Sequence, residues 1–118
     1  MEKSPASLNE AIGSIDAAIT VCDADLRLLY MNEKSRLTFG GKDSGPLVGS
    51  SLIDCHKPQS VEKMREILAS GRPNVYTISK NGVRKLIWQA PWEKDGEIGG
   101  LVEISISLPE AVPHYDRG

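Results

Sequence analysis

The sequence predicts a single α+β domain with one five-stranded antiparallel sheet, helices on one face of that sheet and a further helix at the N-terminus. Three observations support this fold class. Two short strand-like segments lie near the N-terminus, a helical block follows them, and three longer strand-like segments come last. A chain of 118 residues is long enough to bury one core and too short for a second domain.

Residues 1–15 are expected to form an amphipathic N-terminal helix. Ser7 and Glu10 have the spacing of a capping box, and Pro5 suits a first turn. An apolar stripe runs along this helix because apolar residues recur at helical spacing. That stripe either covers an open face of the sheet or pairs with the same helix of a second copy of the chain, and the spacing leaves both open. Its members are Leu8, Ala11, Ile12 and Ile15.

Residues 17–32 are expected to form a β-hairpin. Ile19 and Val21 alternate with polar or small residues, and an acidic turn then separates them from a second apolar segment at 26–31. Asn32 ends the hairpin directly before a polar, helix-favouring segment. Its amide is therefore expected to cap the helix that follows.

The clearest helix follows a glycine-rich connector at residues 40–46, which lacks the Gly-Lys-Ser/Thr ending of a phosphate-binding loop. Ser60 is the expected N-cap of this helix, and Gly71 and Pro73 are its expected stop signals. One side of the helix carries an apolar stripe that should be buried. The stripe consists of Val61, Met64, Ile67 and Leu68.

Three more strands should form an antiparallel meander. Asn-Gly at 81–82 and Asp-Gly at 95–96 are strong hairpin turns. Pro91 lies near the end of the middle strand and predicts either an edge position or a bulge there. Pro109 ends the last strand and begins a polar tail. The three strands are expected at residues 74–80, 83–92 and 98–108.

Composition excludes several classes of function. A formal charge of −2, from 14 basic and 16 acidic residues, leaves no electrostatic footprint for nucleic acid. The apolar runs are too short to cross a membrane, and no signal peptide precedes Ser4, so a cytoplasmic protein is expected. Cys22 and Cys55 are too few for a disulfide framework and do not have zinc-ligand spacing. Both are expected to be reduced.

Several local motifs together resemble a PAS domain over residues 14–108. A strand ending at Asp23 is followed by a strand ending in Tyr-Met-Asn at 30–32, and later by the segments 49–56 and 94–104, all in the order of that family. The resemblance implies three parts: a flanking helix at 1–15, a PAS domain at 16–108 and a polar tail at 109–118. Residues 54–63 resemble a prokaryotic PAS subclass that is found beside hemerythrin-like domains and has a Cys-His-Pro-Pro-x-Ser motif.

The resemblance implies a sensory module of signal transduction or transcriptional regulation that binds a small ligand between sheet and helices. A homodimer and a signalling partner or output domain outside this chain are the implied partners. Two alternatives stay open: a ligand-free dimerisation or interaction module, and a core filled by its own side chains. The candidate ligand-binding residues are Ile19, Val21, Tyr30, Asn32, Ile53, His56, Met64, Ile67, Tyr76, Ile78, Trp88 and Leu101.

The sequence does not identify a cofactor. Flavin is not expected, because Cys55 lies six residues after Gly49 whereas the photoreactive relatives place the cysteine three residues after the glycine. Haem would use His56 as its ligand, although this imidazole can equally bond the backbone and hold the turn before Pro58. Pro109 follows the last strand directly, so no continuous helix should lead to a downstream domain.

An enzyme is not expected. Cys55 and His56 are adjacent, and neighbouring side chains in an extended stretch point to opposite faces, so they do not form a nucleophile and base pair. The only other histidine, His114, lies in the polar tail. The carboxylates are scattered over turns and helix faces.

Overall fold

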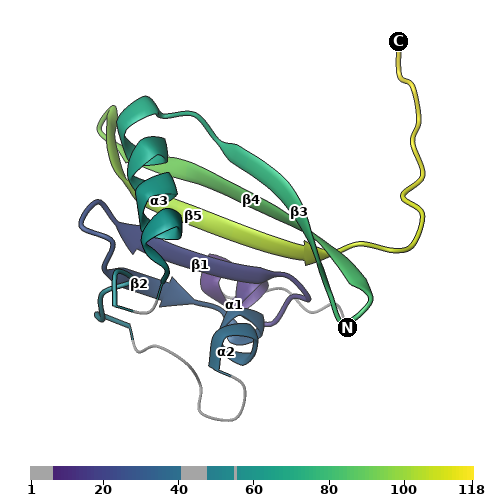
Figure 1. The fold of residues 1–118 in the computed structure, drawn as a ribbon, viewed down its shortest axis with the longest axis horizontal. Coiled ribbons are helices and arrows are strands. Elements are labelled where there is room, and N and C mark those ends of the chain that lie inside the picture. Colours follow the sequence, from purple (N-terminus) through teal and green to yellow (C-terminus); the bar gives the residue numbers. More distant parts are fainter. Residues whose placement is uncertain (1–6, 41–47, 55) are drawn as a thin grey trace.

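The computed structural model describes residues 7–40, 48–54 and 56–118, which form one sheet and the helices around it (Figure 1). All five strands are antiparallel and lie in the order β2-β1-β5-β4-β3. The expected α+β fold class is confirmed. The elements are α1 (Leu8–Gly13), β1 (Ala18–Asp23), β2 (Leu28–Met31), α2 (Glu33–Gly40), α3 (Pro58–Ser70), β3 (Asn74–Lys80), β4 (Val83–Lys94) and β5 (Glu97–Ser107).

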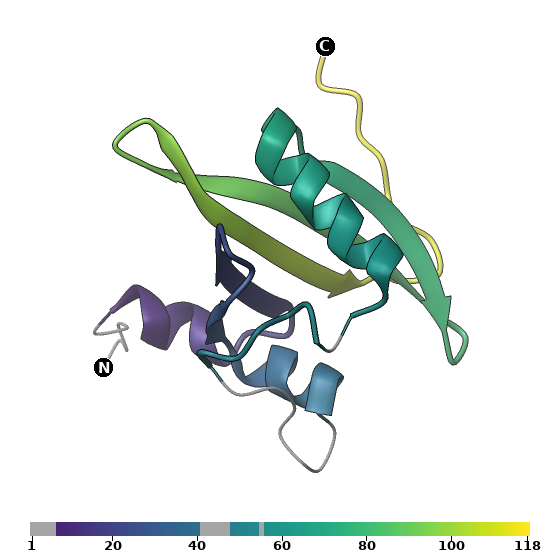
Figure 2. The same cartoon turned by 60° about the vertical axis from the view of Figure 1, so that its left-hand side comes forward.

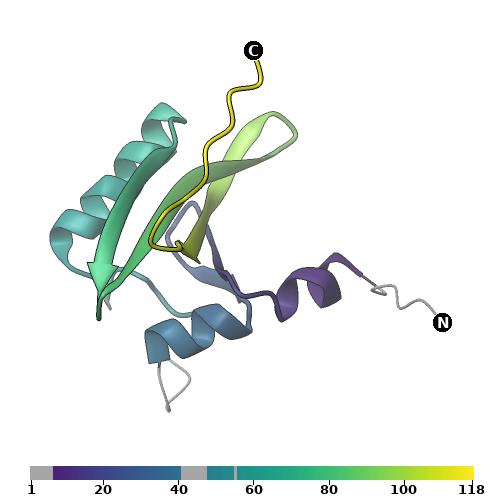
Figure 3. The same ribbon diagram turned by 90° about the vertical axis from the view of Figure 1, so that its right-hand side faces the viewer.

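Helices α2 and α3 lie on the same side of the sheet (Figure 2). Helix α1 instead projects away from the strands, as Figure 3 shows from the side. The capping box of α1 is present in part, since the Ser7 hydroxyl accepts a hydrogen bond from the Glu10 N–H at 3.2 Å. Helix α1 is shorter than expected and ends at Gly13, so Ile15 of the apolar stripe lies beyond it. The rest of the stripe is not buried, and Leu8 is 75% exposed. The stripe therefore does not cover a face of the sheet. Pro5 lies outside the described residues.

The turn between β1 and β2 is held by one aspartate. The Asp23 carboxylate accepts hydrogen bonds from the N–H groups of Asp25 and Arg27, both at 2.9 Å. Leu26 takes a left-handed conformation with φ 62° and is buried, so β2 begins at Leu28 instead of residue 26. The short acidic side chain thus supplies the bonds that this tight turn needs.

The Asn-Gly and Asp-Gly turns behave as expected, because both residues of each turn have positive φ. The φ angles are 53° at Asn81, 78° at Gly82, 54° at Asp95 and 80° at Gly96. Pro91 lies within β4, which is paired on both sides and continues to Lys94. Of the two alternatives for this proline, the structure shows a bulge, one residue beyond it, where the register shifts after Trp92.

The backbone of β5 approaches that of its neighbour β1 closely at Gly100. A Cβ atom at this position would overlap the backbone carbonyl oxygen of Cys22. The indole N–H of Trp92 donates a hydrogen bond to the same carbonyl at 3.0 Å. Glycine is therefore required here by the close approach of two backbones.

Helix α3 begins at Pro58, and its N-cap is Lys57, which makes no side-chain capping bond. The expectation that Ser60 would be the N-cap is wrong. Proline at the first helical position has a suitable φ angle and lacks the N–H group that a cap would satisfy, so the helix starts earlier. Gly71 ends the helix as expected, with φ 74° and an N–H that donates to the Ile67 carbonyl at 2.8 Å.

The hydrophobic core lies beneath α3, at one end of the sheet. The apolar stripe of α3 is buried there as expected, with Leu68 packed at its edge. Because α3 covers only this end, the rest of the same face of the sheet is not filled by the core. The core residues are Cys22, Leu26, Leu28, Met31, Leu52, Val61, Met64, Ile67 and Leu101.

Asn32 connects four residues of the surrounding backbone through its side-chain amide, and it is only 1% exposed. Its Oδ1 accepts from the Ser35 N–H at 3.0 Å, which confirms the expected cap of α2, and from the Ile19 N–H at 2.9 Å. Its Nδ2 donates to the carbonyls of Ile12 at 3.0 Å and Ala17 at 2.8 Å. The amide thus ties α1, β1 and α2 together with all of its hydrogen-bonding capacity.

Candidate ligand-binding cavity

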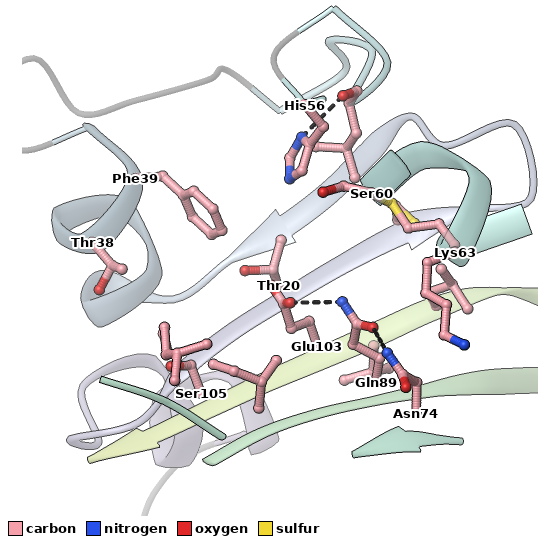
Figure 4. A pocket seen from close by; sticks show the side chains of 18 of the residues that line it. Thr20, Thr38, Phe39, His56, Ser60, Lys63, Asn74, Gln89, Glu103 and Ser105 are labelled. Carbon is pink, nitrogen blue, oxygen red and sulfur yellow. Dashed lines mark hydrogen bonds between the residues drawn. The ribbon is translucent and has the colours of Figure 1, made fainter. Parts of the chain in front are cut away.

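A cavity of about 510 Å³ lies between the sheet and helices α2 and α3 (Figure 4). Its floor is one face of the sheet, here called the cavity face, and the opposite side is called the outer face. Successive residues of a strand point to opposite faces, so every second residue lines the cavity. On the cavity face these are Ala18, Thr20 and Cys22 of β1, Leu101, Glu103 and Ser105 of β5, Lys85, Ile87 and Gln89 of β4, and Asn74, Tyr76, Ile78 and Lys80 of β3.

Five of the predicted site residues line this cavity. His56 and Met64 come from the loop before α3 and from α3 itself. Tyr76, Ile78 and Leu101 come from the floor. These five residues therefore lie together around the cavity, two at its helical wall and three on its floor.

Four other predicted residues lie on the wrong face. Ile19, Val21 and Trp88 pair with outer-face positions of β5, and Tyr30 pairs with Val21. The prediction that these residues line the cavity is therefore wrong, because the cavity is lined by their immediate neighbours along each strand. Strand β1 is buried on both faces, so its alternation did not reveal which residues point inward.

The remaining three predicted residues do not line the cavity either. Asn32 uses its amide for the bonds described above, and Ile67 is fully committed to the core. Ile53 lies outside the cavity lining and is exposed. Their expected placement in the cavity is corrected, because capping and core packing take up the first two side chains.

A row of polar residues that sequence reasoning missed crosses the cavity floor. Asn74 Nδ2 donates to Gln89 Oε1 at 2.9 Å, and Gln89 Nε2 donates to Glu103 Oε1 at 2.9 Å. These residues are direct cross-strand neighbours, and Thr20 is the next neighbour on β1. Thr20 and Ser35 of α2 share a hydrogen bond between their hydroxyl groups. We call Asn74, Gln89, Glu103, Thr20 and Ser35 the polar row.

Apolar and polar residues alternate along β5, and this pattern alone would place Glu103 on a solvent-exposed face. The usable signal was the pairing itself, because the Asp-Gly turn sets Gln89 opposite Glu103 once the bulge is counted. Polar side chains that meet across strands on a covered face indicate a built polar site. Neither Gln89 nor Glu103, taken alone, indicates a polar site.

Two titratable groups of the cavity are shifted toward their neutral forms. Burial raises the pKa of Tyr76, and the negative charge of Glu103 raises it further. Burial also raises the pKa of the Cys22 thiol, which has no disulfide partner among the described residues. A neutral, buried thiol is a poor nucleophile. Cys55 lies outside the described residues, so the structure does not test a pairing with Cys22.

His56 lies at the helical wall of the cavity. Its Nδ1 is 3.0 Å from the Leu52 carbonyl oxygen, and its ring lies 6.2 Å from the Phe39 ring, centroid to centroid. The backbone bond holds the turn before α3, as one of the two sequence-based alternatives anticipated. In the part of the chain that the structure describes, no three His, Cys, Asp or Glu side chains are grouped to hold a metal ion.

The fold agrees with comparisons to known proteins. A family model described as PAS fold matches residues 12–112. The PAS domain of BvgS from Bordetella pertussis is similar, with 21% identity, a TM-score of 0.61, and 85% of this chain and 82% of that chain covered. A sensory box sensor histidine kinase from Vibrio cholerae has 16% identity, a TM-score of 0.58, and coverage of 86% and 90%.

The Aer2 receptor from Vibrio cholerae, described as a dual PAS-haem oxygen sensor, has 17% identity, a TM-score of 0.57, and coverage of 79% and 95%. No curated protein matches the chain. Across the described ranges, no helix has the length and apolar character needed to span a membrane. PAS domains are sensory signalling modules and not catalysts. Because the family match covers most of the sequence, the chain belongs to the PAS family.

Proposed function

We propose that this PAS module binds a small, mostly apolar ligand in the cavity and signals its presence through protein contacts. The observation that carries the proposal is the cavity itself. Its volume of about 510 Å³ lies within the range of roughly 300–1,000 Å³ typical of ligand pockets. Apolar and aromatic side chains make up half of the lining residues, and polar side chains, which include most of the polar row, make up the other half.

Exposed apolar side chains within the cavity favour a pocket over a filled core. Phe39, Tyr76 and Ile78 line it, yet they are 42%, 41% and 40% exposed. In a filled core, these side chains would be covered by their neighbours. A ligand that covered them would gain the hydrophobic free energy that the fold leaves unused.

A chain of hydrogen bonds connects the cavity to α1. Thr20 on the floor bonds Ser35, whose N–H donates to Asn32, whose amide in turn donates to the Ile12 carbonyl in α1. A ligand that moves Thr20 therefore acts on α1 through Ser35 and Asn32. We propose that this route passes ligand occupancy to α1.

Homodimerisation through α1 is the proposed output contact. The apolar stripe of α1 is exposed, and the helix projects away from the sheet (Figure 3). Such a stripe pairs well with its own copy across a two-fold axis. A ligand-free dimerisation module is the alternative function that this same surface supports.

Native mass spectrometry of the purified protein separates the two functions. A retained small-molecule mass supports the sensor, whereas a dimer with no bound mass supports the interaction module. The matched variant is Ser105→Phe, which fills the cavity from the floor and should abolish the retained mass. Thr77→Phe is the control, because Thr77 is exposed on the outer face of β3.

A haem-binding form of the sensor would use His56. This imidazole lines the cavity, and its Nδ1 is anchored to the Leu52 carbonyl, as ligating histidines commonly are. His56 would supply an imidazole nitrogen as a ligand to the haem iron. A Soret band after haem reconstitution, lost in His56→Ala, would support this form, and a colourless protein would remove it.

The finer relationships are also proposals. The motif at residues 54–63 supports a place in the PAS subclass found beside hemerythrin-like domains. We propose that the chain consists of a flanking helix at 1–15, a PAS domain at 16–108 and a tail at 109–118. We also propose that it works in the cytoplasm and that its partner is a kinase or a transcription regulator. Co-purification from the source organism, with and without Leu8→Glu in α1, tests that partner.

A further inference from the structure

We propose that the cavity selects a ligand with an apolar or aromatic body and a protonated amino group, and that Glu103 pairs with this group. The inference rests on the proposed sensory function, since it names the ligand class for the same cavity. It is carried by the position and the hydrogen bonds of Glu103 in the polar row.

Glu103 is a half-buried carboxylate without a cationic partner. In residues 7–40, 48–54 and 56–118 the ion pairs are Lys34 with Asp16 at 2.9 Å and Lys63 with Glu66 at 3.2 Å. Neither pair includes Glu103. Buried charges in proteins are normally paired, because leaving water is costly for an isolated charge, and a ligand that covers Glu103 would bury it. A ligand with a positive charge can therefore supply the cation that pairs with Glu103.

The direction of the polar row leaves an acceptor facing the cavity. An ionised carboxylate only accepts hydrogen bonds, so Gln89 must present its Nε2 to Glu103 and its Oε1 to Asn74. One oxygen of Glu103 is thereby used. The other oxygen has no donor among the residues that the structure describes, and Figure 4 shows this side chain at the cavity floor.

The surroundings of Glu103 suit an ammonium group and an apolar body. Thr20 lies directly across the strand pair, and Ser105 lies two residues further along the same face of β5. Their hydroxyls can accept N–H groups of an ammonium ion that are not used by the carboxylate. Tyr76 and Phe39 offer exposed aromatic surface nearby, on which a cation or an aromatic ring packs favourably.

Lysines at the cavity mouth do not neutralise Glu103. Lys63 is engaged with Glu66, as described above. Lys85 is four residues from Gln89 on β4, which places it about 13 Å from the polar row at the normal rise of a strand. An anionic ligand would have to place its charge at that distant end, beside Lys80 and Lys85, where a second hollow opens.

The test compares three ligands that share an indole body and differ in charge. Calorimetry should show that tryptamine binds more tightly than neutral tryptophol and than anionic indole-3-propionate. Glu103→Gln, which keeps the size of the side chain, should weaken tryptamine by about ten- to a hundredfold and leave tryptophol unchanged. Glu97→Gln is the control, because Glu97 is an exposed carboxylate on the same strand.

Two results would overturn the ligand class and leave cavity binding intact. One is an equal affinity for tryptamine and tryptophol, or an affinity for tryptamine that Glu103→Gln does not change. The other is a preference for indole-3-propionate that Glu103→Gln strengthens. If none of the three ligands binds and the neutral apolar dye Nile red is also excluded, the proposed sensory function itself fails.

Discussion

Replacing Asn32 with alanine should be among the most damaging changes to this fold, although it removes only one small polar group. The side chain is 1% exposed and makes four hydrogen bonds to the backbone of four residues. Alanine leaves the N–H groups of Ile19 and Ser35 without partners in a buried environment. It also releases the carbonyls of Ile12 and Ala17 at a part-buried site.

The cost follows from these four orphaned groups. Each buried N–H left unpaired costs about 1 kcal/mol, and the two carbonyls, which water reaches more easily, cost about 1 kcal/mol together. The expected loss is therefore about 3 kcal/mol of unfolding free energy, a large share of the roughly 5–15 kcal/mol typical of a domain. The melting temperature should fall by roughly 12 °C for a chain of this length.

Urea denaturation followed by the fluorescence of Trp88 and Trp92 measures this loss, with the slope of the transition unchanged. Asn9→Ala is the matched control, since Asn9 is exposed on α1, and it should change stability by less than about 0.5 kcal/mol. Asn32→Asp keeps both accepting bonds but sets a carboxylate against two carbonyl oxygens, so it should be no more stable than Asn32→Ala. A loss below about 1 kcal/mol in Asn32→Ala would refute the reasoning.

Three further predictions concern other parts of the molecule. Gly100→Ala should lower stability by about 3 kcal/mol, because its Cβ meets the Cys22 carbonyl; circular dichroism melting checks this, and a loss no larger than that of Thr77→Ala would contradict it. Burial raises the pKa of the Cys22 thiol in the folded protein, so above the ordinary pKa of 9.0 the thiol ionises in the unfolded chain before it ionises in the folded protein. The folded protein should therefore lose stability as the pH rises above this value. Cys22→Ala should show a shallower alkaline loss in urea titrations, and parallel pH curves would exclude this origin. Leu8→Glu should shift the protein toward monomer in native mass spectrometry while Asn9→Glu does not, and an unchanged dimer would remove α1 as the interface.

Local chemistry was sufficient to predict the elements and their order. Asn-Gly and Asp-Gly turns impose positive φ angles, Gly71 ends α3, and the spacing of Val61, Met64 and Ile67 sets the buried side of that helix. These signals depend on residues close together in the chain. The antiparallel sheet and the helices on one of its faces follow from them.

Tertiary pairing decided which side chains face the cavity. Ile19 and Val21 were expected inside, yet Thr20 and its neighbours Glu103 and Gln89 occupy that face. A strand buried on both faces carries no local mark of its inner side, and a shift of one residue exchanges the two faces completely. The sequence by itself therefore determined the sheet, the helices and the existence of a covered face, whereas only the folded strand register decided that a carboxylate would stand on the cavity floor.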